Sequence, residues 1–98
     1  MRAKLIDGKA IAEALREEVK QKVAERVKKG LPAPGLATVL VGENPASQVY
    51  VRMKHKACQE ANIISTGNVL PANASQAEVE DLVHKLNADA NIHGILVQ

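Results

Sequence analysis

Three polar side chains fall on one face of a predicted helix and have the chemistry needed for proton transfer. Ser47, Tyr50 and Lys54 are spaced at i+3 and i+4, and residues at these spacings are neighbours on a helix surface. A lysine that is partly withdrawn from water favours its neutral form, in which the amine accepts protons. Tyr50 is the single aromatic residue of the chain, and its ring can stack on a planar ligand.

Gln98 is a fourth candidate, because an amide side chain both donates and accepts hydrogen bonds. It ends an apolar run of strand type, and the helix with Lys54 follows another such run that ends at Val41. In parallel α/β sheets, ligands bind at the carboxyl ends of the strands. We therefore expect Lys54 and Gln98 to meet at one edge of a sheet. Spacing alone does not separate this arrangement from an ordinary surface Tyr–Lys pair and a plain strand-end glutamine.

The elements that must position these residues alternate along the chain. Helices are predicted after the capping residues Asp7, Asn44 and Ser75, the second of them running to about Asn62. Strands are predicted at 36–41, 63–70 and 95–98, and the first and last are nearly continuous apolar runs, typical of strands covered on both faces. The alternation predicts an α/β fold in three layers, with right-handed crossovers and a small parallel sheet.

Two of the helices carry apolar stripes that predict how they pack. The stripe of the first helix repeats at i+4 steps: Ile11, Leu15, Val19, Val23 and Val27. The stripe of the second helix is expected beside the polar row: Ala46, Val49, Met53 and Ala57. This places Lys54 at the border between core and solvent.

Composition excludes several classes of function. The 98 residues are enough for one domain, and 13 basic against 11 acidic residues give a net charge of only +2. A nucleic-acid binder usually shows a clustered basic face with aromatic residues for stacking, and neither is present. No stretch approaches the ~20 apolar residues of a membrane span, and no secretory signal opens the chain. We expect a cytoplasmic protein without nucleic-acid or membrane partners.

Cysteine and histidine usage predicts neither a disulfide nor a metal site. Cys58 is the only cysteine, which suits a reducing compartment, and we interpret it as a packed helix residue rather than a nucleophile. His55, His84 and His93 share no metal-ligand spacing. The chain stops on its last apolar strand, which we interpret as a piece of a longer polypeptide. A chain that completes its sheet by oligomerising is the alternative.

The segment from Gly42 to Cys58, GENPASQVYVRMKHKAC, carries a resemblance to a known family. Preceded by Val41, it closely resembles the signature V-G-x-N-P-A-S-x-x-Y-x-x-x-K-x-K-A-C of the bifunctional methylenetetrahydrofolate dehydrogenase/cyclohydrolases. The opening KLIDGK, the entry APGLA into the first strand and the final HGILVQ agree with the family as well. The resemblance spans all 98 residues and implies the N-terminal, folate-binding catalytic domain of such an enzyme at 1–98, with the amino-acid-dehydrogenase-like N-terminal fold.

The family implies a function in one-carbon metabolism and purine biosynthesis. Its members oxidise methylenetetrahydrofolate with NADP, or with NAD in some cases, and hydrolyse the methenyl product to formyltetrahydrofolate. The Y-x-x-x-K motif falls on Tyr50 and Lys54, so that Tyr50 would stack on the aminobenzoyl ring and Lys54 would transfer the protons of hydrolysis. The V-Q pair falls on Val97 and Gln98, with Gln98 bonded to Lys54 and to the pterin side, and Ser47 matches a motif serine near the lysine.

The resemblance also implies what lies elsewhere in such enzymes. The family continues into a C-terminal NAD(P)-binding Rossmann domain, which is absent from these 98 residues, so no cofactor-binding residue is expected here and NADP would be held by that domain. A homodimer is expected at full length. Two further hypotheses are an isolated folate-binding or assembly module without catalysis, and a structural fragment that pairs through its sheet edge.

Overall fold

The chain forms a small α/β fold with the expected alternation of elements. The computed structural model describes residues 2–98, so Met1, where the predicted domain begins, lies outside the described residues. The elements follow in chain order: α1 (Gly8–Lys28), β1 (Gly35–Val41), α2 (Pro45–Glu60), β2 (Ile64–Leu70), α3 (Gln76–Asn87) and β3 (Gly94–Val97). The predicted strand boundaries and the end of α2 are confirmed to within two residues.

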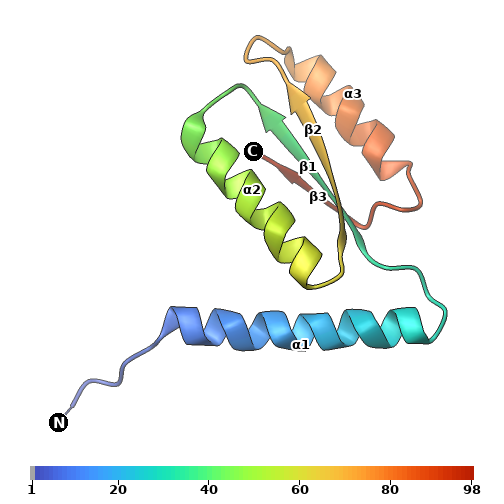
Figure 1. Cartoon of the computed structure of the whole chain (residues 1–98). Helices are drawn as coiled ribbons and strands as arrows, with labels where there is room; N and C mark the ends of the chain where they lie inside the picture. The colour runs from blue at the N-terminus through green and yellow to red at the C-terminus, as the bar shows by residue number, and fades with distance from the viewer. Residues whose placement is uncertain (1) are drawn as a thin grey trace.

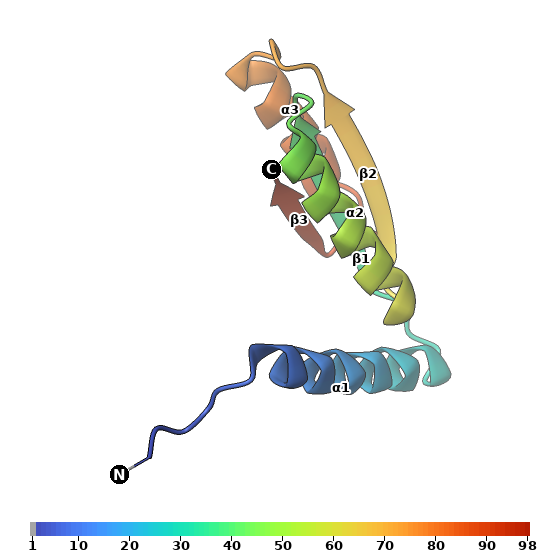
Figure 2. The same cartoon turned by 60° about the vertical axis from the view of Figure 1, so that its left-hand side comes forward.

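The three strands form one parallel sheet in the order β2-β1-β3. The crossover through α2 leads from β1 to one side of the sheet, and the crossover through α3 leads back past β1 to the other side. Two right-handed crossovers in opposite directions place their helices on opposite faces. Figures 1 and 2 show α2 on one face and α3 on the other, so the three-layer prediction is confirmed.

The core is centred on β1. Ala37, Thr38, Val39 and Leu40 are all buried, with Thr38 only 1% and Val39 0% exposed. A strand with a neighbour on each side and a helix on each face has no route to solvent, as its continuous apolar run predicted. The same expectation for 95–98 was wrong: β3 is an edge strand, half-buried, and Val97 is 49% exposed.

The start and end of α2 are set by local sequence. The Asn44 side chain accepts hydrogen bonds from the backbone N–H groups of Ala46 and Ser47, and Pro45 occupies the first helical position. After the helix, Asn62 adopts a left-handed φ of 61°, which turns the chain toward β2. Asn44 is thus the cap that the sequence predicted.

The face that α2 turns to the sheet differs from the predicted one. Val49 and Met53 of the expected apolar stripe are exposed. Of that stripe only Ala57 is covered. The covered positions are half polar and half apolar: Ser47, Val51, Lys54, His55, Ala57 and Cys58. The centre of the covered face is thus shifted by about one residue, which is a rotation of about 100° about the helix axis. The difference arises because polar side chains of α2 find hydrogen-bond partners on the sheet.

Helix α1 forms as predicted but does not pack on either face of the sheet. Asp7 caps it by accepting from the backbone N–H of Ala10, and Gly30 ends it with a φ of 81°. Figures 1 and 2 show α1 crossing below the sheet and its two covering helices. Of its apolar stripe only Val23 is buried, while Leu15 is 55% exposed. None of the helices within residues 2–98 combines the length and apolarity of a membrane span.

Candidate functional site

The centre of the candidate site is a hydrogen bond between two side chains that are 44 residues apart in the sequence. Lys54 Nζ donates to Gln98 Oε1 at 2.6 Å. Lys54 lies in the middle of α2 and Gln98 directly follows β3, and both side chains are half-buried. The contact expected from the resemblance is present at the sheet edge, where the strands end.

The backbone of Gln98 is held by the central strand. Its N–H donates to the Val39 carbonyl at 2.7 Å, and its carbonyl accepts from the Val41 N–H at 2.9 Å. Successive side chains of an extended strand point to opposite faces. The Gln98 side chain therefore lies on the α2 face, and the ladder to β1 fixes its position relative to Lys54.

Tyr50 and Ser47 lie on α2 toward the same edge of the sheet. Tyr50 is one turn before Lys54 and is 55% exposed, so its ring is accessible to a ligand. Ser47 lies one turn before Tyr50, closer to the start of α2, and is half-buried. The structure thus brings four of the predicted residues to one edge, with Tyr50 and Ser47 supplied by the same helix as Lys54.

Val97 is not brought to this group through its side chain. It points to the opposite face of the sheet from Gln98 and lines a shallow groove with Val83 and Asn87 of α3. The alternation along β3 makes this unavoidable, because neighbouring residues of a strand cannot share a face. Its assignment to substrate binding stays a prediction.

A polar network beside Lys54 was missed by sequence reasoning. Both ring nitrogens of His55 are engaged: Nε2 with Thr38 Oγ1 at 3.2 Å, and Nδ1 with Ser65 Oγ at 2.7 Å. A sequence signal for it exists: a threonine in the middle of the apolar run of β1, and a polar stretch in β2 from Ser65 to Asn68. The pairing of β1 with β2 places that stretch beside Thr38.

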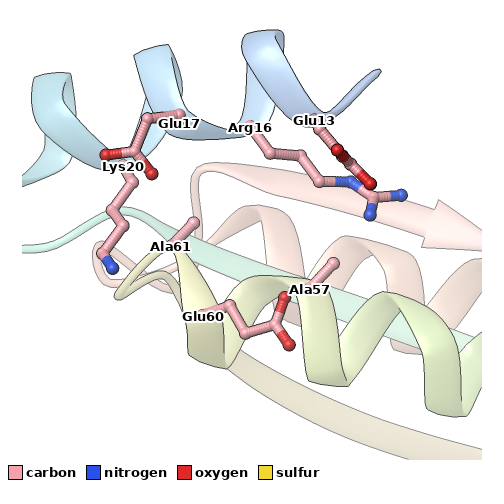
Figure 3. Close-up of a pocket in the computed structure, with 7 residues that line it drawn as sticks. All are labelled: Glu13, Arg16, Glu17, Lys20, Ala57, Glu60 and Ala61. Carbon is pink, nitrogen blue, oxygen red and sulfur yellow. The ribbon is translucent and has the colours of Figure 1, made fainter. Parts of the chain in front are cut away.

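A separate groove lies away from the Lys54–Gln98 edge. It has a volume of about 400 Å³ and separates α1 from the C-terminal half of α2 (Figure 3). Its polar lining mixes both signs of charge: Glu13, Arg16, Glu17, Lys20 and Glu60. No predicted site residue lines it. Three acidic and two basic groups alternate in this open groove and leave only one net negative charge, so the Lys54–Gln98 edge remains the candidate site.

The remaining titratable groups do not suggest a second centre. Burial raises the pKa of the Cys58 thiol, which keeps it protonated and unreactive. This agrees with its interpretation as a packed helix residue. Within residues 2–98 no cluster of His, Cys, Asp and Glu side chains has the arrangement needed to hold a metal ion.

Comparisons with known proteins agree with this geometry. Residues 6–98 match the model of the tetrahydrofolate dehydrogenase/cyclohydrolase catalytic domain. The bifunctional FolD methylenetetrahydrofolate dehydrogenase/cyclohydrolase of Campylobacter jejuni is 46% identical, with a TM-score of 0.90, over 97% of this chain and 33% of that chain. A 5,10-methylenetetrahydrofolate dehydrogenase of the silkworm Bombyx mori is 35% identical, with a TM-score of 0.94, over 99% and 33%.

A third solved structure carries ligands. The methylenetetrahydrofolate dehydrogenase-cyclohydrolase of Trypanosoma brucei, in complex with NADP and an inhibitor, is 37% identical, with a TM-score of 0.89, over 100% of this chain and 34% of that chain. The present chain thus spans about a third of the length of these enzymes. On its sequence match and its fold together, it belongs to the tetrahydrofolate dehydrogenase/cyclohydrolase family, as the catalytic domain.

Proposed function

We propose that the natural protein containing this chain oxidises methylenetetrahydrofolate with NADP and hydrolyses the methenyl product to formyltetrahydrofolate. The observation that supports this most is the Lys54–Gln98 hydrogen bond of 2.6 Å at the carboxyl edge of the sheet. It places a half-buried amine with a fixed orientation where α/β folds bind their ligands.

Lys54 is the proton-transfer group of the proposed hydrolysis. A water molecule attacks the cationic methenyl carbon between the two folate nitrogens while the Lys54 amine takes one of its protons. A neutral tetrahedral carbinolamine results. The bond from this carbon to one ring nitrogen then breaks with its electron pair left on the nitrogen, and the lysine ammonium gives a proton to that nitrogen. The carbinol hydroxyl loses its proton to solvent and becomes the formyl carbonyl. The products are formyltetrahydrofolate, one released proton and the lysine in its starting form, so one group serves as base and then as acid.

The neighbouring side chains orient the reactants. The Gln98 carbonyl oxygen accepts one Nζ hydrogen, which directs the amine and leaves its lone pair for the water. The Gln98 amide N–H₂ group is available to a pterin carbonyl. Tyr50 is exposed one turn away and can stack on the aminobenzoyl ring, and Ser47 extends this row toward the strand ends.

The residues described here do not fit a nicotinamide dinucleotide. Pyrophosphate sites use free backbone N–H groups at a helix N-terminus after a glycine-rich turn. At α2, Asn44 already caps the first N–H groups, Pro45 has none, and the turn holds one glycine. We therefore assign NADP to another part of the natural protein. A cytoplasmic location and a homodimer remain predictions, the first resting on the single reduced cysteine.

The decisive test is Lys54→Ala in the natural protein. Hydrolysis of methenyltetrahydrofolate, followed by loss of its absorbance, should fall by ~10²–10⁴-fold, the usual contribution of a positioned acid/base. Lys85→Ala, at an exposed position of α3, is the matched control and should hydrolyse normally. Near-normal hydrolysis by Lys54→Ala would remove this residue from its proposed role.

A further inference from the structure

His55 stands next to the proposed catalytic lysine and joins α2 to two strands. Its ring contacts Thr38 Oγ1 on β1 through Nε2 and Ser65 Oγ on β2 through Nδ1. Both bonds connect α2 to the sheet and together they use every polar atom of the imidazole. A solvent-facing histidine would have no need of such partners.

The surrounding hydrogen bonds fix which ring nitrogen carries the proton. Thr38 Oγ1 donates to the Thr66 carbonyl at 3.4 Å, so it must accept from His55 Nε2–H. Nδ1 then accepts from the Ser65 hydroxyl. Thr38 is 1% exposed, so the loss of His55 would leave a buried hydroxyl with one partner fewer and no water to replace it.

The backbone of β2 makes room for this ring. Gly67 is the register partner of Thr38, and a Cβ added there would lie 3.3 Å from His55 Nε2 and 3.9 Å from Thr38 Oγ1. A side chain at this position would therefore press on the imidazole. Three residues of the sheet surround the ring: the buried Thr38 on β1, Gly67 opposite it on β2, and Ser65 near the start of β2.

Lys54 and His55 reach opposite sides of the central strand. Neighbouring residues of a helix point about 100° apart. With the order β2-β1-β3, Lys54 extends toward Gln98 after β3, and His55 extends toward Ser65 on β2. Three of the other covered side chains of α2 are apolar, Val51, Ala57 and Cys58, and apolar contacts are not directional. Directed bonds on both sides of β1 are what specify the rotation of the helix.

We propose that His55 is a positioning residue for Lys54: its bridge between Thr38 and Ser65 sets the rotation of α2 at which Lys54 Nζ meets Gln98. This inference rests on the proposed role of Lys54 in hydrolysis. Without the bridge, α2 is free to turn toward the alternative face that carries Val49 and Met53, and the amine moves away from its partner.

The test compares two activities of the natural protein in the same variants. In His55→Leu, kcat for methenyltetrahydrofolate hydrolysis should fall by ~10- to 100-fold, because a shift of about 1 Å in a reacting group has effects of this size. A change in KM caused by Tyr50 turning with the helix should be similar for both activities. The kcat of methylenetetrahydrofolate oxidation with NADP should change far less than that of hydrolysis, because no proton transfer by Lys54 is proposed for the oxidation. His55→Gln, whose amide nitrogen can still donate to Thr38, should recover most of the hydrolysis. His84→Leu, the same change at an exposed position of α3, should behave as the unchanged protein.

The results for the His55 and Lys54 variants test the positioning role and the proposed function independently. Equal losses of hydrolysis and oxidation in His55→Leu, or normal hydrolysis in a folded variant, would overturn the positioning role. Normal hydrolysis in Lys54→Ala would instead overturn the function on which it rests. If His55→Leu does not accumulate as folded protein, Ser65→Ala takes its place, since it removes only the donor to Nδ1. A selective loss of hydrolysis in that variant supports the bridge, and an unchanged ratio of the two activities contradicts it.

Discussion

Helices α1 and α2 of this protein differ in a way that their sequences alone would not suggest. Helix α1 has the regular apolar stripe, with a valine, leucine or isoleucine at every fourth position, yet nearly all of that stripe is exposed. Helix α2 covers an equal number of polar and apolar side chains and is the better attached of the two. The attachment of α2 includes three hydrogen bonds from side chains of neighbouring residues, Lys54 and His55.

The comparison separates two uses of side chains in one fold. Apolar periodicity specifies that a segment is a helix and which side of it seeks cover, but not which surface provides the cover. Hydrogen bonds with defined partners specify a single rotation and register, since an unpaired polar group in the interior is costly. The candidate site lies on the helix that is fixed in the second way.

The largest effect on stability is expected from the core that α2 covers, compared with the stripe of α1. Leu40→Ala removes most of a side chain that is 6% exposed and faces α2, and it should lower the free energy of unfolding by about 3 kcal/mol. Leu15→Ala, at 55% exposure, should change it by less than about 0.5 kcal/mol. Urea unfolding followed by circular dichroism measures both. Equal losses would show that the α1 stripe is covered in solution, and the contrast between the helices would disappear.

A smaller effect is expected from the two helix caps. Asn44→Ala and Asp7→Ala each remove a side chain that accepts from the backbone N–H groups of a first turn, a change of about 1 kcal/mol. Because α2 is attached to the sheet, the first substitution should lower the stability of the whole domain. The second should only increase hydrogen exchange in the first turn of α1. A domain-wide loss of protection in Asp7→Ala would contradict this.

The smallest expected effect is the pH dependence of stability that comes from Cys58 on the covered face of α2. Burial raises the folded-state pKa of Cys58, so above the unfolded value of ~8.5 the unfolded chain releases a proton that the folded chain retains. Stability should therefore fall as pH rises through this range, and part of that slope should be lost in Cys58→Ala. Native Cys58 should also react slowly with a thiol reagent. Rapid labelling at neutral pH would show that α2 opens from the sheet.

The predictions from sequence differ in success for physical reasons. The caps Asp7, Asn44 and Ser75 were predicted correctly, since these signals act on backbone groups only a few residues away. The burial of β1 was predicted correctly from its apolar run. The burial of β3 was not, because an apolar run does not show whether a strand has one neighbour or two.

The candidate site was predicted in part. Lys54 and Gln98 were selected by residue type and by the family resemblance, and the structure places their side chains in contact. The face of α2 was misplaced by one residue, and His55 was considered only as a possible metal ligand. Its partners lie 17 and 10 residues away on two strands, so its environment depends on a register that periodicity does not contain.

The sequence by itself determined the six elements, their caps, their order and the membership of the family, because these depend on local backbone chemistry and on residue identities. Only the tertiary structure decided that β1 is central, that α2 presents Lys54 and His55 to opposite sides of it, and that Val97 faces away from Gln98. The physical reason is that strand order and helix rotation follow from contacts between distant segments. Those contacts exist only after the sheet has assembled.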